Sequence, residues 1–409
     1  MAVARPGGRA ARPPARPVPG ASRQAHVLDA GAITAELNRL WARLSEPGAT
    51  GAPAGATGGL EGTLTRASTL NLTAVARSRR DAERVERAVV RLGDLYPSRA
   101  TILVADPDHP RGPEPGIDVR LALLEQEAGG GRPAIRFECV TVEVNAADER
   151  QLASIASPLL VVDLPDFLWW AADSVVGSEL FDDLIEVSDR LIVDTAAAAN
   201  PAAELVRLAA LLDQGGHPPK LSDFAWVRLE PWRHLVALFF DQPRALPTLD
   251  SIDEVQIVYG TAGADGRTGL TGALLLAGWL GSRLGWQAPG ELVRSRNEPT
   301  GWQATLRSGG RGRRREVLLS LRPAPDPVAD CGLAGVTLLA EGGASFRVER
   351  FDPAELATFS QVDGLPIGRR MVYAPLPDDA GLLADELRDF GHDAVYEAAL
   401  RFATPLAPG

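Results

Sequence analysis

The stretch that decides the fold class covers residues 69–106 and reads TLNLTAVARSRRDAERVERAVVRLGDLYPSRATILVAD. Residues 69–76 and 100–106 are strand-like apolar runs, and residues 81–95 between them have the apolar spacing of an amphipathic helix. A strand, a helix and a strand in that order form a βαβ unit, which places two parallel strands in one sheet. The sequence therefore predicts an α/β fold.

Three further segments extend the predicted sheet. IDVRLALLEQ over residues 117–126 and IRFECVTVEV over residues 135–144 alternate in polarity and flank a glycine loop, so we expect an antiparallel pair. LLVVD over residues 159–163 reads as a buried strand, followed by a Pro-Asp turn and two adjacent tryptophans. We therefore expect a mixed sheet with flanking helices.

The second half of the chain also mixes helices and strands. Asn200 is a predicted N-cap, with Pro201 in the first position of a helix that ends before Gly215. The apolar segment over residues 269–286 is a predicted helix that packs closely on a neighbour, because small residues recur in it at four-residue steps. These small residues are Gly269, Ala273, Ala277 and Gly281. Short strands and two closing helices complete a second α/β domain.

These patterns divide the chain into four predicted regions. They are a disordered Arg/Pro-rich tail over residues 1–27, a helix and flexible linker over residues 28–60, an N-terminal α/β domain over residues 61–166 and a C-terminal α/β domain over residues 167–409.

Composition narrows the function. The formal net charge is -11 and the isoelectric point is near 5.1, which disfavours binding to the phosphate backbone of nucleic acids. The longest apolar run is too short to cross a bilayer. The two cysteines, Cys139 and Cys331, are far apart and form no CxxC pattern. We expect a cytoplasmic protein without a disulfide framework.

No catalytic, metal or cofactor site emerges from the sequence. The five histidines do not fall at metal-ligand spacing, and no nucleophile lies in a recognisable elbow beside one of them. The glycine loop GTAGADGRTG, which runs from Gly260 to Gly269, follows a strand and precedes a helix, as phosphate loops do. It matches neither phosphate-binding pattern, since it is not GxGxxG and has no P-loop lysine.

Tryptophans and arginines form the remaining candidate site. Trp169 and Trp170 follow the Pro-Asp turn, while Trp226 and Trp232 alternate with arginines. Large aromatics usually pack in a core, but aromatic residues combined with arginine are also typical of interface hot spots. We predict that the following residues bind a protein partner or support the face that does: Asp166, Trp169, Trp170, Trp226, Arg228, Trp232 and Arg233.

Four long motifs resemble one family. DLPDFLWW (163–170), DFAWVRLEPWR (223–233), LAGWLGSRLGW (276–286) and LADELRDFGHDAVYEAAL (383–400) resemble the ordered landmarks of the glucose-6-phosphate dehydrogenase assembly protein OpcA, and YPSRATILV (96–104) resembles a strand of its first domain. The resemblance runs from about residue 64 to residue 403.

The resemblance implies a non-catalytic protein that binds glucose-6-phosphate dehydrogenase, promotes its active oligomer and raises its activity in the oxidative pentose phosphate pathway. The chain departs from some relatives in one respect. A cysteine pair near the C-terminus is thought to serve redox control in some members, whereas the last cysteine here is Cys331. We therefore expect no redox control through such a pair.

Two hypotheses follow from the sequence. In the first, the protein activates the dehydrogenase allosterically, because it binds the active conformation better than the inactive one. In the second, the chain is an enzyme or sensor that binds a sugar phosphate or nucleotide at the loop between Gly260 and Gly269, with tryptophans stacking on the ligand. The resemblance favours the first.

Overall fold

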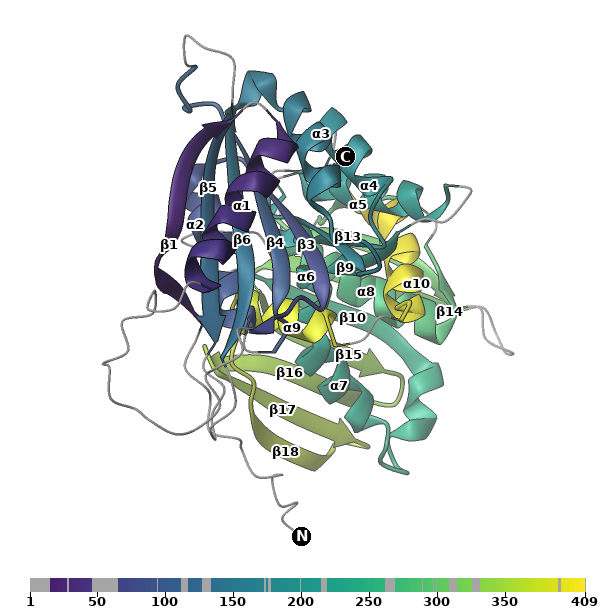
Figure 1. Cartoon of the computed structure of the whole chain (residues 1–409). Coiled ribbons are helices and arrows are strands. Elements are labelled where there is room, and N and C mark those ends of the chain that lie inside the picture. The colour runs from purple at the N-terminus through teal and green to yellow at the C-terminus, as the bar shows by residue number, and fades with distance from the viewer. Residues whose placement is uncertain are drawn as a thin grey trace, which may run out of the picture. The chain divides into compact units, whose positions relative to one another are not determined.

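The structure is a computed structural model (Figure 1). It describes all residues except 1–14, 28, 46–64, 94, 112–116, 127–133, 173, 176–177, 199, 215–218, 262–268, 289, 297, 299, 309–314, 326–331, 389–390 and 409. Contacts divide the chain into two units. The first consists of Met1–Ala172, Ser178–Leu191 and Asp379–Phe390, and the second of Asp173–Gly177, Ile192–Asp378 and Gly391–Gly409. Each unit combines helices with a mixed sheet, which confirms the predicted fold class. The domain boundary placed after residue 166 stays a prediction.

The first unit contains the predicted βαβ order. Its strands are β1 (Arg16–Val27), β2 (Thr65–Arg66), β3 (Leu70–Ala76), β4 (Ser98–Asp106), β5 (Ile117–Gln126), β6 (Ile135–Asn145) and β7 (Asp166–Trp170), followed by β8 (Arg190–Val193) at its border. Its helices are α1 (Ala30–Ser45), α2 (Arg79–Leu92), α3 (Arg150–Leu159), α4 (Glu179–Ile185) and α9 (Asp379–Glu386).

The strands follow the order β1-β5-β6-β4-β3-β7-β8, with β2 beside β6. β3 and β4 are parallel and joined by α2, whose N-cap Ser78 accepts a hydrogen bond from the backbone of Asp81. β5 and β6 are antiparallel, as expected. β3 is parallel to β4 and to β7, and β4 is parallel to β6. The carboxyl ends of these four strands therefore lie at one edge of the sheet.

Helices cover both faces of this sheet. α1 contacts α3, and α3 contacts α4, whereas α2 contacts α9. Adjacent residues of β6 show that the two groups lie on opposite faces: Glu138 accepts a hydrogen bond from Trp41 of α1, and Phe137 lies against Gly93 at the end of α2. A sheet covered on both faces needs apolar side chains on both, which explains the fully buried runs in β3 and β4.

Two predictions for this unit are wrong. Residues 159–163 do not form a strand: α3 extends to Leu159, and the strand is β7, which contains both tryptophans. LLVVD and DFLWW are equally apolar, and pairing with β3 decides between them. The predicted disordered tail also differs from the structure, because Arg16–Val27 pair with β5 as β1. Distant pairing of this kind leaves no local pattern. Residues 1–14 lie outside the described part of the chain.

The second unit contains one large sheet. The strands of this sheet are β10 (Ile252–Tyr259), β11 (Trp286–Gln287), β12 (Val293–Arg294), β13 (Trp302–Ser308), β14 (Arg315–Pro323), β15 (Leu333–Ala340), β16 (Ala344–Asp352), β17 (Glu355–Val362) and β18 (Leu365–Tyr373). The unit also contains β9 (Lys220–Asp223), which is not part of the large sheet. Its α-helices are α5 (Pro201–Leu212), α6 (Phe224–Val227), α7 (Glu230–Phe239), α8 (Leu270–Leu284) and α10 (Ala394–Ala403), and 3₁₀ turns include η2 (Thr195–Ala197) and η3 (Leu246–Ser251).

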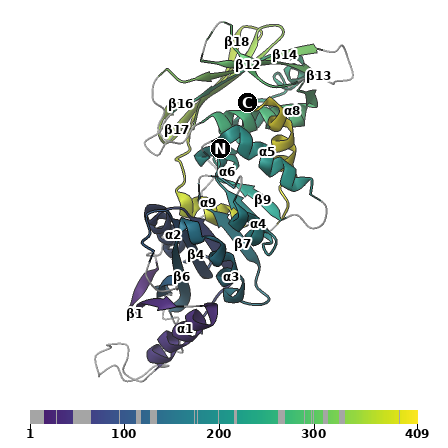
Figure 2. The same cartoon turned by 90° about the horizontal axis from the view of Figure 1, so that it is seen from above.

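The large sheet follows the order β11-β13-β14-β10-β15-β16-β17-β18, with β12 beside β13. β10 and β14 are parallel, and the other pairs are antiparallel. α7 and α8 contact this sheet, and Figure 2 shows α5, α6 and α8 gathered on one of its faces. One face therefore carries the core, and the other carries alternating polar side chains.

Two glycines of α8 permit close helix packing: Gly281 is one of the predicted small residues, and Gly278 is not. A Cβ on Gly278 would lie 2.2 Å from the carbonyl oxygen of Ala399 in α10, and a Cβ on Gly281 would lie 2.2 Å from the ring of Phe402. α8 therefore approaches α10 closely enough for its backbone to touch that helix.

Candidate functional site

The seven predicted partner-binding residues fall into two groups, one in each unit. Asp166, Trp169 and Trp170 belong to β7, and the other four belong to α6, α7 and the turn between them. The four tryptophan rings are 1–3% exposed. Their binding to a partner stays a prediction, and as placed here they can act on a partner through the surfaces that they support.

The tryptophan pair of β7 packs on opposite faces of the first sheet. Trp169 lies under the guanidinium of Arg84 in α2, 6.0 Å from its ring centre, and Trp170 meets Phe181 of α4 edge-on at 5.2 Å. Successive residues of a strand point to opposite faces, so a sheet covered on both sides buries both rings. Two adjacent tryptophans are thus explained by the packing of β7.

Asp166 fixes the entry to β7. Its Oδ1 accepts a hydrogen bond from the side-chain amide of Asn71 at 2.7 Å, and its backbone N–H donates to Asp189 at 2.9 Å. Burial raises the pKa of this carboxyl, while the Asn71 hydrogen bond opposes the shift. Asp166 therefore holds β3, β7 and the start of β8 together.

In the second unit, the motif around Trp226 forms a partly buried polar cluster. The indole N–H of Trp226 donates to Asp393 at 2.7 Å, and the Arg233 guanidinium lies 3.5 Å from the centre of the Trp226 ring. Arg228 donates two hydrogen bonds to Asp194, at 2.7 and 2.8 Å. Burial lowers the pKa of Arg233 to about 10, which leaves it charged at neutral pH.

Asp223 lies at the centre of this cluster and is fully buried. Its carboxylate accepts hydrogen bonds from the backbone and hydroxyl of Thr195, from the backbone of Ala225 and from the hydroxyl of Tyr396. Burial, together with the nearby charge of Asp194, raises the pKa of Asp223 to about 7. The cluster joins η2, α6 and α10, so its polar groups specify how these elements pack.

Trp232 packs between α7 and the large sheet. It is 2% exposed and lies on α7, which packs against β16. Arg350 of β16 lies over its ring at 5.6 Å, and Phe346 of the same strand contacts Phe239 and Phe240. Phe346, Val348 and Arg350 therefore lie on the side of β16 that faces α7, and Arg347 and Glu349 point away from it.

The side of β16 that faces away from α7 carries an exposed aromatic and cationic surface. Arg347 of β16, Phe359 of β17 and Arg369 of β18 lie directly opposite one another across three strands. Both guanidinium carbons lie over the Phe359 ring, at 4.6 and 5.3 Å from its centre. Met371 and Tyr373 continue the same side of β18 and are 44% and 69% exposed. We call these five residues the arginine–phenylalanine face.

β18 also ends the strand order of the large sheet. Among the described strands none pairs with its outer edge, so the backbone groups on that side face outward. Sequence reasoning missed the arginine–phenylalanine face, because its residues are spread over three strands. The combination of arginine with aromatic and apolar residues in FRVERF (346–351) and RRMVY (369–373) was the available signal.

The described residues contain no group of three or more His, Cys, Asp or Glu side chains that could hold a metal ion. Burial raises the pKa of the Cys139 thiol to about 12, so this cysteine stays protonated. The glycine loop considered for phosphate binding lies outside the described residues from 262 to 268, as does Cys331. No helix in the described ranges is long and apolar enough to span a membrane.

The turn after β3 differs from a dinucleotide-binding turn. It reads Arg77-Ser78-Arg79-Arg80, without the glycines that let a backbone approach a pyrophosphate. Arg77 pairs with Glu149, donates to Ser178 at 3.1 Å and lies over the Trp170 ring at 5.7 Å. Side chains of the protein thus occupy the space beside the end of β3.

Solved structures resemble this chain only weakly. An oxidoreductase from Sinorhizobium meliloti is 13% identical and covers 83% of this chain and 97% of its own, with a TM-score of 0.43. The transcriptional regulator Gal80p of a Kluyveromyces yeast is 11% identical and covers 82% of this chain and 87% of its own, with a TM-score of 0.45. Scores this low carry no argument.

Curated relatives carry one name. A protein of Nostoc punctiforme named OxPP cycle protein OpcA is 28% identical over 283 residues, which are 64% of this chain and 56% of the relative. A protein of the same name from Synechococcus elongatus is 29% identical over 64% of this chain and 58% of its own length. The chain thus spans a little more than half the length of these relatives.

Two family models match consecutive parts of the chain. The model described as the N-terminal domain of a glucose-6-phosphate dehydrogenase subunit matches residues 90–210, and the model of the corresponding C-terminal domain matches residues 219–400. The matches include all seven predicted residues and the arginine–phenylalanine face. This chain belongs to the OpcA family of glucose-6-phosphate dehydrogenase assembly proteins.

Proposed function

We propose that this protein is a non-catalytic assembly factor and allosteric activator of glucose-6-phosphate dehydrogenase in the oxidative pentose phosphate pathway. The observation that supports this most is the arginine–phenylalanine face, an exposed surface within the residues that match the family's C-terminal domain. Activation follows if the protein binds the active conformation or oligomer of the dehydrogenase more tightly than the inactive one.

We assign the arginine–phenylalanine face to the dehydrogenase. Arginine, aromatic residues and methionine are enriched at protein interfaces, and energetic hot spots favour aromatic and arginine side chains. Phe359 holds two guanidinium groups in fixed positions, so a partner that binds them need not order these long side chains. The outer edge of β18 offers backbone hydrogen bonds beside this face.

The predicted tryptophans then serve as a scaffold. Trp232 and Arg350 support β16 from the side opposite the face, and the Asp223 cluster holds α6, η2 and α10 beside α7. Replacing a buried support alters the face that it supports, even though the support itself never touches the partner. Trp169, Trp170 and Asp166 hold β7 in the sheet of the first unit.

The occupied turn after β3 agrees with a non-catalytic role. In α/β proteins that bind dinucleotides, this turn receives the pyrophosphate at a helix N-terminus. Here the turn has no glycine, and Arg77 pairs with Glu149 and Ser178 beside it.

A binding and activation assay tests the proposal. Purified protein is mixed with the dehydrogenase from the same cells, complex formation is followed by sedimentation velocity, and dehydrogenase activity is measured in parallel. We expect a complex and a higher activity. The double variant Phe359→Ala/Arg369→Ala should lose both, because each true anchor contributes about 2 kcal/mol or more of binding. Leu246→Ala serves as the control, since Leu246 is 56% exposed but lies on η3, outside this face.

The outcomes separate the function from the surface. If the unaltered protein neither binds the dehydrogenase nor raises its activity, the proposed function is wrong. If it does both and the double variant is folded and equally active, the function stands and the face has been assigned wrongly. Circular dichroism and the unfolding midpoint establish that each variant is folded.

A further inference from the structure

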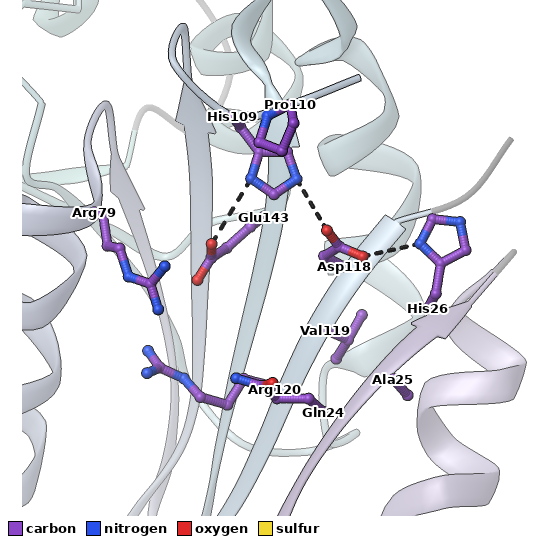
Figure 3. A pocket seen from close by; sticks show the side chains of 10 residues that line it. All are labelled: Gln24, Ala25, His26, Arg79, His109, Pro110, Asp118, Val119, Arg120 and Glu143. Carbon is purple, nitrogen blue, oxygen red and sulfur yellow. Dashed lines mark hydrogen bonds and ion pairs between the residues drawn. The ribbon is translucent and has the colours of Figure 1, made fainter. Parts of the chain in front are cut away.

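A polar pocket in the first unit is not used by the proposed function. It has a volume of about 500 Å³ and lies where the parallel strands end, between α2, β1, β5 and β6 (Figure 3). Its volume is within the range of small-molecule sites. In α/β sheets, ligands bind outside the carboxyl ends of the strands, and His109 follows β4 while Glu143 is near the end of β6.

The two ends of the pocket differ in chemistry. Figure 3 shows the guanidinium groups of Arg79 and Arg120 pointing into the same part of the pocket. The other end carries a chain of acids and imidazoles: His26 Nδ1 and His109 Nε2 lie 2.9 and 3.1 Å from the two oxygens of Asp118. One end therefore suits an anionic group, and the other suits hydroxyl groups, which can both donate and accept hydrogen bonds.

Two of the charged groups that face the pocket have unused bonding capacity. The exposed guanidinium of Arg79 forms no ion pair or hydrogen bond with the residues that the structure describes. The Glu143 side chain is 17% exposed, and within the described chain its nearest basic neighbour is the His109 imidazole, at 3.9 Å. Arg79 and Glu143 line the same pocket without pairing with each other, so a ligand between them could satisfy both.

Arg120 completes the end of the pocket that suits an anionic group, and it already forms one hydrogen bond within the protein. It donates to Glu86 of α2 at 2.9 Å, and this pair holds its guanidinium in place. A fixed guanidinium beside a free one can bind a phosphate or carboxylate through several charge-assisted hydrogen bonds, while the fixed one loses little conformational freedom.

We propose that this pocket binds a small anion that also carries several hydroxyl groups, such as a sugar phosphate or a sugar acid. Arg79 and Arg120 bind the anionic group, and Glu143 and Asp118 accept hydrogen bonds from the hydroxyls. The site is distinct from the arginine–phenylalanine face, and its test requires no dehydrogenase.

Calorimetric titration of the full chain tests the proposal. The probes are glucose 6-phosphate, gluconate, glucose and inorganic phosphate. We expect saturable binding of glucose 6-phosphate, gluconate or both, at least about tenfold tighter than binding of glucose or phosphate, because neither of these carries both groups. Comparison of glucose 6-phosphate with gluconate identifies the anionic group. Phosphate binding as tightly as both sugar anions, or no binding of either sugar anion at millimolar concentration, overturns the proposal.

Variants place the ligand in this pocket. Arg79→Gln should weaken binding of the preferred probe by about tenfold or more, whereas Arg80→Gln, an exposed neighbour on α2 that does not line the pocket, should leave it unchanged. Glu143→Gln removes an acceptor for the hydroxyls and a negative charge, so it should weaken binding of the sugar anion without weakening the binding of phosphate. Equal effects of Arg79→Gln and Arg80→Gln would mean that general surface charge, not this pocket, binds the anion. The unfolding temperature of each variant confirms that it is folded.

Discussion

Arg228 donates to both carboxylate oxygens of Asp194, and the two side chains are only 15% and 8% exposed. Removing one partner of a pair this buried leaves a charge that water cannot reach. We expect Arg228→Ala to lower the free energy of unfolding by about 3–5 kcal/mol. Arg228→Lys should cost less, because it keeps the charge and one hydrogen bond. Urea denaturation measures both, and an Arg228→Ala variant with the wild-type midpoint would contradict the prediction.

Asp223 should make stability depend on pH in an unusual direction. Its pKa is about 7 in the folded protein and about 3.9 in an unfolded chain, so the folded state holds the proton more tightly. Its contribution is therefore complete below about pH 4 and is lost as the pH rises to about 7. Between these values the free energy of unfolding should fall more steeply for the wild type than for Asp223→Asn.

Urea titrations at a series of pH values check this prediction. Asp250→Asn is the control, because Asp250 is exposed, and it should keep the wild-type slope. If Asp223→Asn also keeps that slope, Asp223 does not titrate in this range.

The contact between α8 and α10 permits a paired test on glycines. Gly278→Ala places a methyl group 2.2 Å from the backbone oxygen of Ala399, so the helices must separate, and we expect a loss of about 1–3 kcal/mol. Gly272→Ala, on the same helix, meets its nearest atom at 3.7 Å. It should be neutral or stabilise by up to about 1 kcal/mol, because alanine favours helix. The unfolding temperature should fall for Gly278→Ala, and it should stay the same or rise for Gly272→Ala.

Trp232 tests the idea of a buried scaffold. Trp232→Ala should lower the free energy of unfolding by about 3–5 kcal/mol, since it opens a cavity between α7 and β16. Trp232→Phe keeps a ring in place and should retain most of the stability together with activation of the dehydrogenase. A folded Trp232→Phe variant that loses activation while the arginine–phenylalanine face remains intact would instead point to direct contact by the indole.

The sequence predicts elements whose signals are local. The βαβ unit around α2 follows from the period of the apolar residues, and α5 begins where Asn200 caps it and Pro201 occupies its first position. β7 and β1 were missed, because pairing with distant strands decides both. An apolar run such as LLVVD carries the same local preference whether a helix end or a strand uses it.

The candidate surface was harder to predict than the motifs. Large aromatics drew attention to Trp169, Trp170, Trp226 and Trp232, and each of them is buried with an arginine over its ring. The exposed arginine–aromatic surface depends instead on the register of β16, β17 and β18. That register places Phe359 between two arginines that are 22 residues apart in sequence, which is invisible until the strands are paired.

The position of α9 in the chain constrains when the first unit can finish folding. This helix contacts α2, its Asp379 accepts a hydrogen bond from Arg84 at 2.9 Å, and Glu386 pairs with Arg190. A ribosome delivers α9 only after almost all of the second unit. While residues 192–378 are being synthesised, the sheet of the first unit therefore lacks one helix on its α2 face, and it becomes complete only after α9 has emerged.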